Sequence, residues 1–264
     1  MDLQLTNRQA LVTGSTGGIG FAIAKGLAAE GAHVTITGRT QTNVDAALAR
    51  LRAALPDAKV AGVAADCATA AGAETVFARV AEVDILVNNL GIYERKAFFE
   101  IPDADWQRMF EVNVMSGIRF SRHYAPAMAT RGWGRILFVS SESGLNIPRE
   151  MIHYGMTKTA QLSITRGLAI ELAGSGVTVN AVLPGPTHTE NSDGMRSKLA
   201  QATGKSIAEI EVDMFITRRP TSLLKRFASA DEVANMAVYL CGAGSSATNG
   251  AALRVDGGVV NQIM

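Results

Sequence analysis

The chain has 264 residues, 47% of them hydrophobic, and its 25 basic and 24 acidic residues give a net charge of +1. The sequence shows neither the basic stripe of a nucleic-acid-binding protein nor the blocks of like charge of a disordered tail. The start of the chain lacks the basic and apolar regions of a signal peptide, and no apolar run is long enough to span a bilayer. Cys67 and Cys241 have no metal-ligand spacing and fit a reducing compartment. We therefore expect a cytoplasmic globular protein without a nucleic-acid or membrane partner.

Short β-branched runs alternate with longer alanine- and leucine-rich segments along most of the chain. The predicted strands are Ala10–Thr13, His33–Thr37, Val60–Ala65, Ile85–Asn88, Ile136–Ser140, Val177–Val182 and Ala252–Val255. The predicted helices are Ile19–Glu30, Asn43–Leu55, Ala70–Val80, Trp106–Met128, Tyr154–Leu172 and Ala230–Cys241. Strands that alternate with helices of this length indicate βαβ units and a parallel sheet, and right-handed crossovers place helices on both faces. The sequence therefore predicts one α/β domain over residues 1–264, a doubly wound Rossmann fold with a seven-stranded parallel sheet.

Residues 186–220 interrupt this alternation. The segment follows a predicted strand, is polar at first, and then becomes amphipathic. A long insertion at the carboxyl end of a strand is where a lid or substrate loop lies in such folds. We therefore expect a substrate loop here.

The first predicted strand leads into Thr13-Gly14-Ser15-Thr16-Gly17-Gly18-Ile19-Gly20 and then into a helix. In this context Gly14 permits a tight turn, and Gly18 lets the backbone approach a pyrophosphate at the helix N-terminus. Gly20 allows close packing of the helix on the strand. A βα turn without a ligand is the alternative interpretation.

The end of the second predicted strand bears on the choice of cofactor. A carboxylate there selects NAD, but this chain has Thr37-Gly38-Arg39-Thr40. The planar donors of Arg39 suit a 2′-phosphate, which favours NADP and leaves NAD possible. A solvated surface arginine is the alternative, and no basic residue in the glycine turn supports Arg39.

Tyr154 and Lys158 lie four residues apart in one predicted helix. This spacing puts both side chains on one face, so that a phenol faces an ammonium group. A free tyrosine has a pKa of about 10, and a nearby positive charge lowers it toward the range of a proton-transfer catalyst. The pair alone also fits an ordinary helix surface, so the surrounding motifs must decide.

Several motifs occur in the order of one known family. They are the glycine turn in its Thr-Gly-x-x-x-Gly-x-Gly form, Asn88-Asn89-Leu90-Gly91, Asn113 in a helix, Ser141 thirteen residues before Tyr154, Tyr154-x-x-x-Lys158, Pro184-Gly185 and Asp256-Gly257-Gly258. In this combination the chain resembles the short-chain dehydrogenases/reductases over nearly its whole length. Leu90 departs from the family pattern, which has a small alanine there, and its side chain must pack near the cofactor.

The resemblance implies a catalytic set. Tyr154 would be the general acid in reduction and the base in oxidation, while Lys158 would lower its pKa and hold the nicotinamide ribose. Ser141 would bind the substrate oxygen, although Ser143 could be the true partner of Tyr154, and either serine also fits a turn. Asn113 would anchor a water that links Lys158 to solvent, or is a satisfied polar residue inside a helix.

The resemblance also implies cofactor contacts from one end of the sheet. The residues are Gly14, Ser15, Thr16, Gly18, Ile19, Gly20, Arg39, Asp66, Asn89, Gly91, Tyr154, Lys158, Pro184, Gly185 and Thr187. Asp66 would meet the adenine amino group, Asn89 the adenosine ribose and Thr187 the carboxamide. Asp66 also fits a simple turn at the end of its strand.

These features predict an oxidoreductase that transfers a hydride reversibly between NADP(H), or NAD(H), and a small carbonyl or secondary alcohol compound. A 3-oxoacyl-type reductase and a catabolic NAD-dependent alcohol or sugar dehydrogenase both remain open. A basic patch at the pocket mouth would favour an acyl-carrier substrate, and its candidates are Arg218, Arg219, Lys225 and Arg226.

A binding protein that senses NADP(H) without turnover is the competing hypothesis, and the intact catalytic set argues against it. No cluster has metal-ligand spacing, so we expect no metal. The resemblance implies a homotetramer or homodimer.

Overall fold

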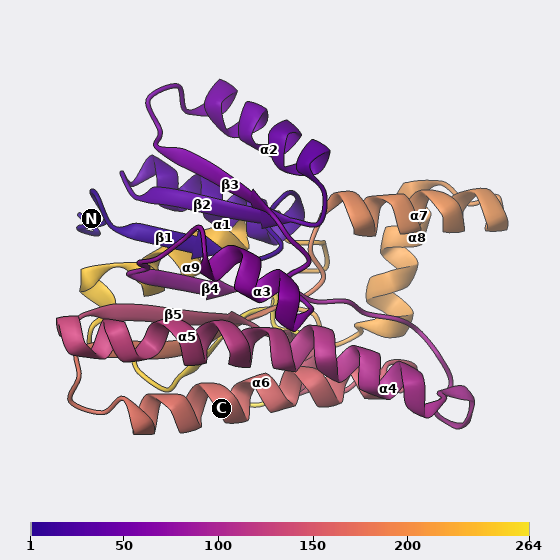
Figure 1. Cartoon of the computed structure of the whole chain (residues 1–264). Helices are drawn as coiled ribbons and strands as arrows, with labels where there is room; N and C mark the ends of the chain where they lie inside the picture. The colour runs from indigo at the N-terminus through magenta and orange to yellow at the C-terminus, as the bar shows by residue number, and fades with distance from the viewer. Residues whose placement is uncertain (1, 264) are drawn as a thin grey trace.

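The computed structural model describes residues 2–263 and contains one twisted sheet with helices on both faces (Figure 1). The sheet has seven strands in the order β3-β2-β1-β4-β5-β6-β7, and every neighbouring pair is parallel. The strands are β1 (Gln9–Val12), β2 (His33–Gly38), β3 (Val60–Ala64), β4 (Ile85–Asn88), β5 (Gly134–Val139), β6 (Val177–Pro184) and β7 (Ala252–Val255). The predicted fold class and strand number are confirmed.

Two apolar cores lie on opposite faces of the sheet, because successive side chains of a strand point to opposite sides. In β1, Ala10 and Val12 belong to one core and Leu11 to the other. The first core is covered by α1 (Gly18–Ala29), α2 (Gln41–Ala54) and α9 (Ala230–Cys241). The second is covered by α3 (Ala70–Phe77), α5 (Ser116–Arg131) and α6 (Ile152–Glu171).

The strand order reverses between β1 and β4, which are hydrogen-bonded neighbours although two strands separate them along the chain. At such a switch point the loops leave the carboxyl ends of adjacent strands in opposite directions and open a crevice for a ligand. The glycine turn follows β1, and Asn89 follows β4. Both segments therefore meet at this point.

The helix predicted over Trp106–Met128 is interrupted by a π-helical turn. It consists of α4 (Asp103–Phe110), the turn η2 (Glu111–Met115) and α5. A π-helical turn contains an extra residue, which rotates the side chains that follow it around the helix axis. Such turns are common at functional sites. The turn contains Asn113, one of the predicted catalytic residues.

Residues 186–220 are largely helical rather than a loop. They contain α7 (Glu190–Thr203), α8 (Ile207–Asp213) and a π-helical turn, η4 (Met214–Arg218). Thr189 and Ser206 begin α7 and α8 with capping boxes, which satisfy the free N–H groups of the first turns. Figure 1 shows both helices projecting beyond the sheet, on the side of its carboxyl ends.

Between residues 2 and 263, no helix is long and apolar enough to cross a membrane. The same part of the chain contains no group of three or more His, Cys, Asp or Glu residues that could hold a metal ion. Cys67 and Cys241 are free and buried.

Candidate active site

A cavity of about 280 Å³ lies at the carboxyl ends of the central strands. Of the predicted site residues, it is lined by Ile19, Asn89, Gly91, Ser141, Ser143, Tyr154, Lys158, Pro184, Gly185 and Thr187. The predicted residues outside this lining are Gly14, Ser15, Thr16, Gly18, Gly20, Arg39, Asp66 and Asn113. The structure thus brings the predicted proton-transfer groups together, next to the glycine turn.

The glycine turn has the geometry that its sequence predicts. Gly14 and Gly18 have φ angles of +58° and +57°, which side chains rarely tolerate. A Cβ atom on Gly20 would lie 2.3 Å from Asn89 Nδ2, so only glycine fits. Asn89 Nδ2 donates to the carbonyl oxygen of Gly14 at 2.9 Å, and Leu90 packs against the same glycine. The two residues after β4 therefore support the turn.

Ser15 differs from its predicted role as a cofactor contact. It is fully buried, and its hydroxyl donates to Val12 O at 2.6 Å and accepts from Thr37 N at 3.1 Å. Its backbone N–H donates to Thr37 O at 3.0 Å. Its hydroxyl thus donates to the end of β1 and its backbone N–H donates to β2, so neither donor is free for a ligand.

The N-terminus of α1 binds a carboxylate from a distant part of the chain. Gly17, the N-cap, offers no side-chain cap, and Gly18 N–H donates to Glu190 Oε2 at 2.8 Å. Arg50 forms an ion pair with Glu190 Oε1 at 3.3 Å. Burial opposes ionisation of Glu190, but hydrogen bonds from backbone N–H groups and Arg50 outweigh it and lower the pKa of the carboxyl. The turn therefore binds an anionic oxygen.

Arg39 is exposed after β2, and its side chain has no hydrogen bond or ion pair with any residue between 2 and 263. A second guanidinium group, that of Arg50, reaches the glycine turn from α2. It donates to Thr16 O at 2.5 Å and lies 4.2 Å from the ring centroid of Phe21. The glycine turn itself contains no basic residue, and the sequence analysis missed Arg50 because it is 34 residues away from Thr16 in the sequence.

Tyr154 and Lys158 lie on one helix, α6, and the ammonium group of Lys158 lies over the ring of Tyr154. Lys158 Nζ lies 5.6 Å from the ring centroid of Tyr154 and donates to Val139 O at 2.8 Å and Gln161 Oε1 at 3.2 Å. Burial raises the pKa of Tyr154 to about 12 and lowers the pKa of Lys158 to about 7. Burial is thus the largest influence on both pKa values, and the lowering of the phenol pKa by Lys158 stays a prediction.

Ser141 and Ser143 have different partners. Ser141 Oγ accepts from the backbone N–H of Ser143 at 3.1 Å. Hydrogen bonding with Ser141 opposes the effect of burial on the pKa of Tyr154. Ser143 Oγ instead donates to Glu142 Oε1 at 3.2 Å. Between the two serines, this arrangement favours Ser141 as the partner of Tyr154.

Asn113 is buried and its side chain is fully engaged. Its Nδ2 donates to Ile92 O at 2.9 Å and Thr157 Oγ1 at 3.0 Å, and its Oδ1 accepts from Ile92 N at 2.7 Å. Its backbone oxygen accepts from Gln161 Nε2 at 2.6 Å. Gln161, which the sequence analysis missed, thus connects Lys158 to the backbone oxygen of Asn113, while the water that would link Lys158 to solvent stays a prediction.

A buried ion pair forms part of the cavity wall. Arg219 Nε donates to Glu142 Oε1 at 2.8 Å, and Arg219 Nη2 lies 2.7 Å from the same oxygen. Glu142 Oε2 is buried and has no hydrogen-bond partner within residues 2–263. Burial raises the pKa of Glu142, although Arg219 opposes this shift. The pair joins the segment after Ser141 to the end of the predicted substrate loop.

Two further predicted residues have local roles. Asp66 is exposed, and its Oδ1 accepts from Ala68 N at 3.2 Å, which is the turn geometry left open as its alternative. Thr187 lines the cavity and donates to Gly185 O at 2.9 Å.

Comparisons with known proteins agree with this fold and identify the family. The family model described as short chain dehydrogenase matches residues 8–200. An uncharacterized oxidoreductase of Bacillus subtilis, YvaG, is 44% identical over 263 residues and the match covers all of both chains. D-beta-hydroxybutyrate dehydrogenase of Cupriavidus necator is 34% identical, with 98% of this chain and 100% of the relative covered.

Among solved structures, L-sorbose reductase from Gluconobacter frateurii, complexed with NADPH and L-sorbose, is 31% identical with a TM-score of 0.94. That match covers 100% of both chains. These relatives define a class of oxidoreductases that act on alcohol and carbonyl groups, and the fold is that of this class. The chain belongs to the short-chain dehydrogenase family.

Proposed function

We propose that the protein transfers a hydride reversibly between NADP(H) and a carbonyl or secondary alcohol. The observation that carries the proposal is the convergence of Ser141, Tyr154 and Lys158 on one cavity beside Ile19 of the glycine turn. Hydride and proton transfer to one carbonyl require the proton donor and the cofactor to meet at the same place. NADPH in the similar L-sorbose reductase supports the choice of cofactor.

The residues of the glycine turn fit the phosphates of such a cofactor. The N–H of Gly18 already donates to a carboxylate oxygen, and the N-terminus of a helix favours anionic groups. Arg39 and Arg50 suit a 2′-phosphate, because both are exposed guanidinium groups, Arg39 directly after β2 and Arg50 at the turn. When bound, the cofactor supplies or accepts the hydride.

The protein's part is to move the proton. Because the pKa of Tyr154 is raised to about 12, the phenol keeps its proton near neutral pH and can donate it to a carbonyl oxygen during reduction. Ser141 is placed to hydrogen-bond the same oxygen. In oxidation Tyr154 must accept a proton, and a protonated Lys158 favours the phenolate. The pKa of Lys158, about 7, lets this charge respond to pH in the working range.

Tyr154→Phe tests the enzyme against the NADP(H)-sensing alternative. We expect the variant to bind NADPH as the wild type does, by fluorescence titration, and to lose at least about a hundredfold in turnover with a panel of ketones. Tyr239→Phe, a matched change on α9, should keep both properties. Wild-type protein that binds NADPH but oxidises it with no ketone would support the sensor instead.

The choice of NADP over NAD has its own test. Titration of the wild type should give tighter binding of NADPH than of NADH, and Arg39→Ala should remove most of this preference. Equal affinities that are indifferent to the substitution would contradict NADP, and would direct the substrate search to NAD-dependent alcohol or sugar dehydrogenases.

A further inference from the structure

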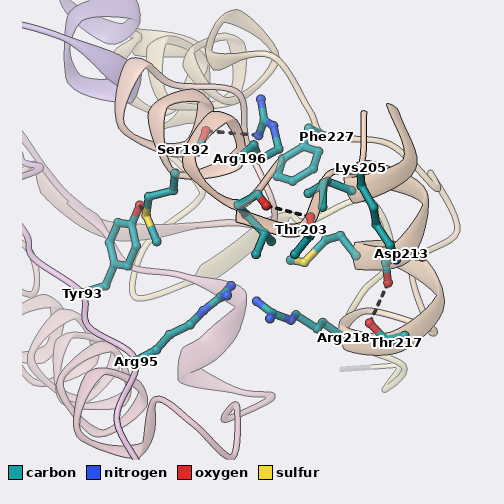
Figure 2. A pocket seen from close by; sticks show the side chains of 14 residues that line it. Tyr93, Arg95, Ser192, Arg196, Thr203, Lys205, Asp213, Thr217, Arg218 and Phe227 are labelled. Atoms are coloured by element: carbon teal, nitrogen blue, oxygen red, sulfur yellow. Dashed lines mark hydrogen bonds and ion pairs between the residues drawn. The ribbon is translucent and has the colours of Figure 1, made fainter. Parts of the chain in front are cut away.

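A second cavity, of about 650 Å³, adjoins the candidate active site (Figure 2). Tyr93 lines both cavities, and its ring centroid lies 6.1 Å from that of Tyr154. Arg95, Met214 and Phe227 also line both. A substrate whose carbonyl group meets Tyr154 can therefore extend past Tyr93 into the second cavity.

The wall of this cavity is strongly basic. Its charged side chains are those of Arg95, Arg196, Lys205, Arg218 and a single acid, Asp213. Two of the cations are neutralised by the protein itself. Arg196 pairs with Asp193 and Glu211, and Lys205 pairs with Asp213.

Arg95 and Arg218 are left without a counter-charge. Neither side chain forms a hydrogen bond or ion pair with any residue between 2 and 263. They come from different parts of the fold: Arg95 follows β4, and Arg218 ends η4. Figure 2 shows their side chains extending toward one another from opposite sides of the cavity. Two facing positive charges repel, and an anion between them relieves this cost.

The other basic residues near the end of the predicted substrate loop are already engaged. Arg219 pairs with Glu142, and Arg226 pairs with Glu232. Lys225 Nζ donates to Pro220 O at 2.8 Å. Of the four residues considered as a basic patch in the sequence, only Arg218 therefore remains available to a ligand.

We propose that Arg95 and Arg218 form an anion-binding subsite, so that the substrate is a carbonyl compound carrying a carboxylate or phosphate group. The proposal rests on the proposed function, since it identifies the substrate class of the same enzyme. Guanidinium groups bind both anions through paired N–H donors. Between this pair and Tyr154 the wall includes apolar and aromatic side chains, among them Met214 and Phe227, which suit a short carbon chain.

The test compares matched ligands with and without the charge. Acetoacetate and acetoacetamide form one pair, and fructose 6-phosphate and fructose form the other. Binding of each to the protein saturated with NADP⁺ is measured calorimetrically, because the oxidised cofactor cannot reduce a ketone. We expect at least one charged ligand to bind about tenfold tighter than its neutral partner, and which pair responds separates carboxylate from phosphate recognition.

Arg95→Ala and Arg218→Ala should each remove most of this preference and leave binding of the neutral ligand unchanged. Both side chains are exposed and unpaired, so their removal leaves no buried polar group without a partner. Arg79→Ala, which removes an exposed charge after α3, should keep the preference. The absence of a charge preference in both pairs, or a preference that both arginine variants retain, overturns the subsite.

Steady-state assays with NADPH and the same four ketones separate this inference from the proposed function. Oxidation of NADPH with similar kcat/KM for charged and neutral ketones would retain the reductase and refute the subsite. A charge preference in binding without oxidation of NADPH by any ketone would retain the subsite and refute the reductase.

Discussion

Glu190→Gln should make the protein bind NADPH more tightly. Glu190 Oε2 accepts from Gly18 N–H at 2.8 Å, and its Oε1 pairs with Arg50 at 3.3 Å. In the proposed function the pyrophosphate uses the same end of α1. The two anions therefore compete, and the bound carboxylate must leave before the cofactor is accommodated. Glutamine has nearly the same shape as glutamate but removes the negative charge.

The size of the expected gain in NADPH affinity follows from how exposed the side chains of Glu190 and Arg50 are. The side chains of Glu190 and Arg50 are 63% and 49% exposed, so their ion pair contributes only about 0.2–1 kcal/mol. An anion at an exposed helix N-terminus contributes about 0.3–1 kcal/mol. Together these terms give about 0.5–2 kcal/mol, which corresponds to a dissociation constant for NADPH lowered roughly 2- to 30-fold.

Fluorescence titration with NADPH at low and high salt measures this change. The difference between variant and wild type should shrink as salt is raised, because the interacting groups are exposed. Glu171→Gln, an exposed change at the end of α6, should have no effect. An unchanged or weaker affinity in Glu190→Gln would refute the competition and suggest that Glu190 supports the bound state.

Three stability predictions follow from the packing. Gly72→Ala should lower the free energy of unfolding by about 1–3 kcal/mol, because its Cβ would lie 1.9 Å from Asp66 O. An unchanged midpoint of chemical denaturation contradicts this. Arg219→Met should lower the free energy of unfolding by about 3–5 kcal/mol, because it leaves Glu142 charged and unpaired. Adding Glu142→Leu should restore most of this stability. If the double variant does not recover, the ion pair is not the cause of the loss. Lys158→Met should raise Tm at pH 7 and abolish turnover. Burial lowers the pKa of Lys158 to about 7 from 10.5, so its charge destabilises the folded state at neutral and lower pH. The gain in Tm should therefore shrink as pH rises toward 10, and a gain independent of pH would exclude this cause.

The sequence predicted the parts of this protein that depend on local patterns. The strands and most helices are found within a few residues of their predicted bounds, because the periods of apolar residues differ between strand and helix. Gly14, Gly18 and Gly20 adopt the turn that their spacing indicates. Tyr154 and Lys158 share a helix for the same local reason.

Local patterns did not predict how the segment at 186–220 folds or which residues complete the site. The segment forms helices that bring Glu190 to Gly18, 172 residues away. Arg219 reaches Glu142 across 77 residues of sequence, and Gln161 reaches the backbone oxygen of Asn113 across 48. No short-range rule relates such positions.

The sequence by itself determined the doubly wound fold, since the periods of apolar residues are local, and its motifs predicted the proton-transfer set through the family resemblance. Only the tertiary structure decided the electrostatics of that set. Lys158 lies over the ring of Tyr154, but its ammonium group also donates to Val139 O and Gln161 Oε1, which the spacing of four residues does not predict. The charge of a buried group depends on every element packed around it, so pKa values and ion-pair partners are fixed only when the chain has folded.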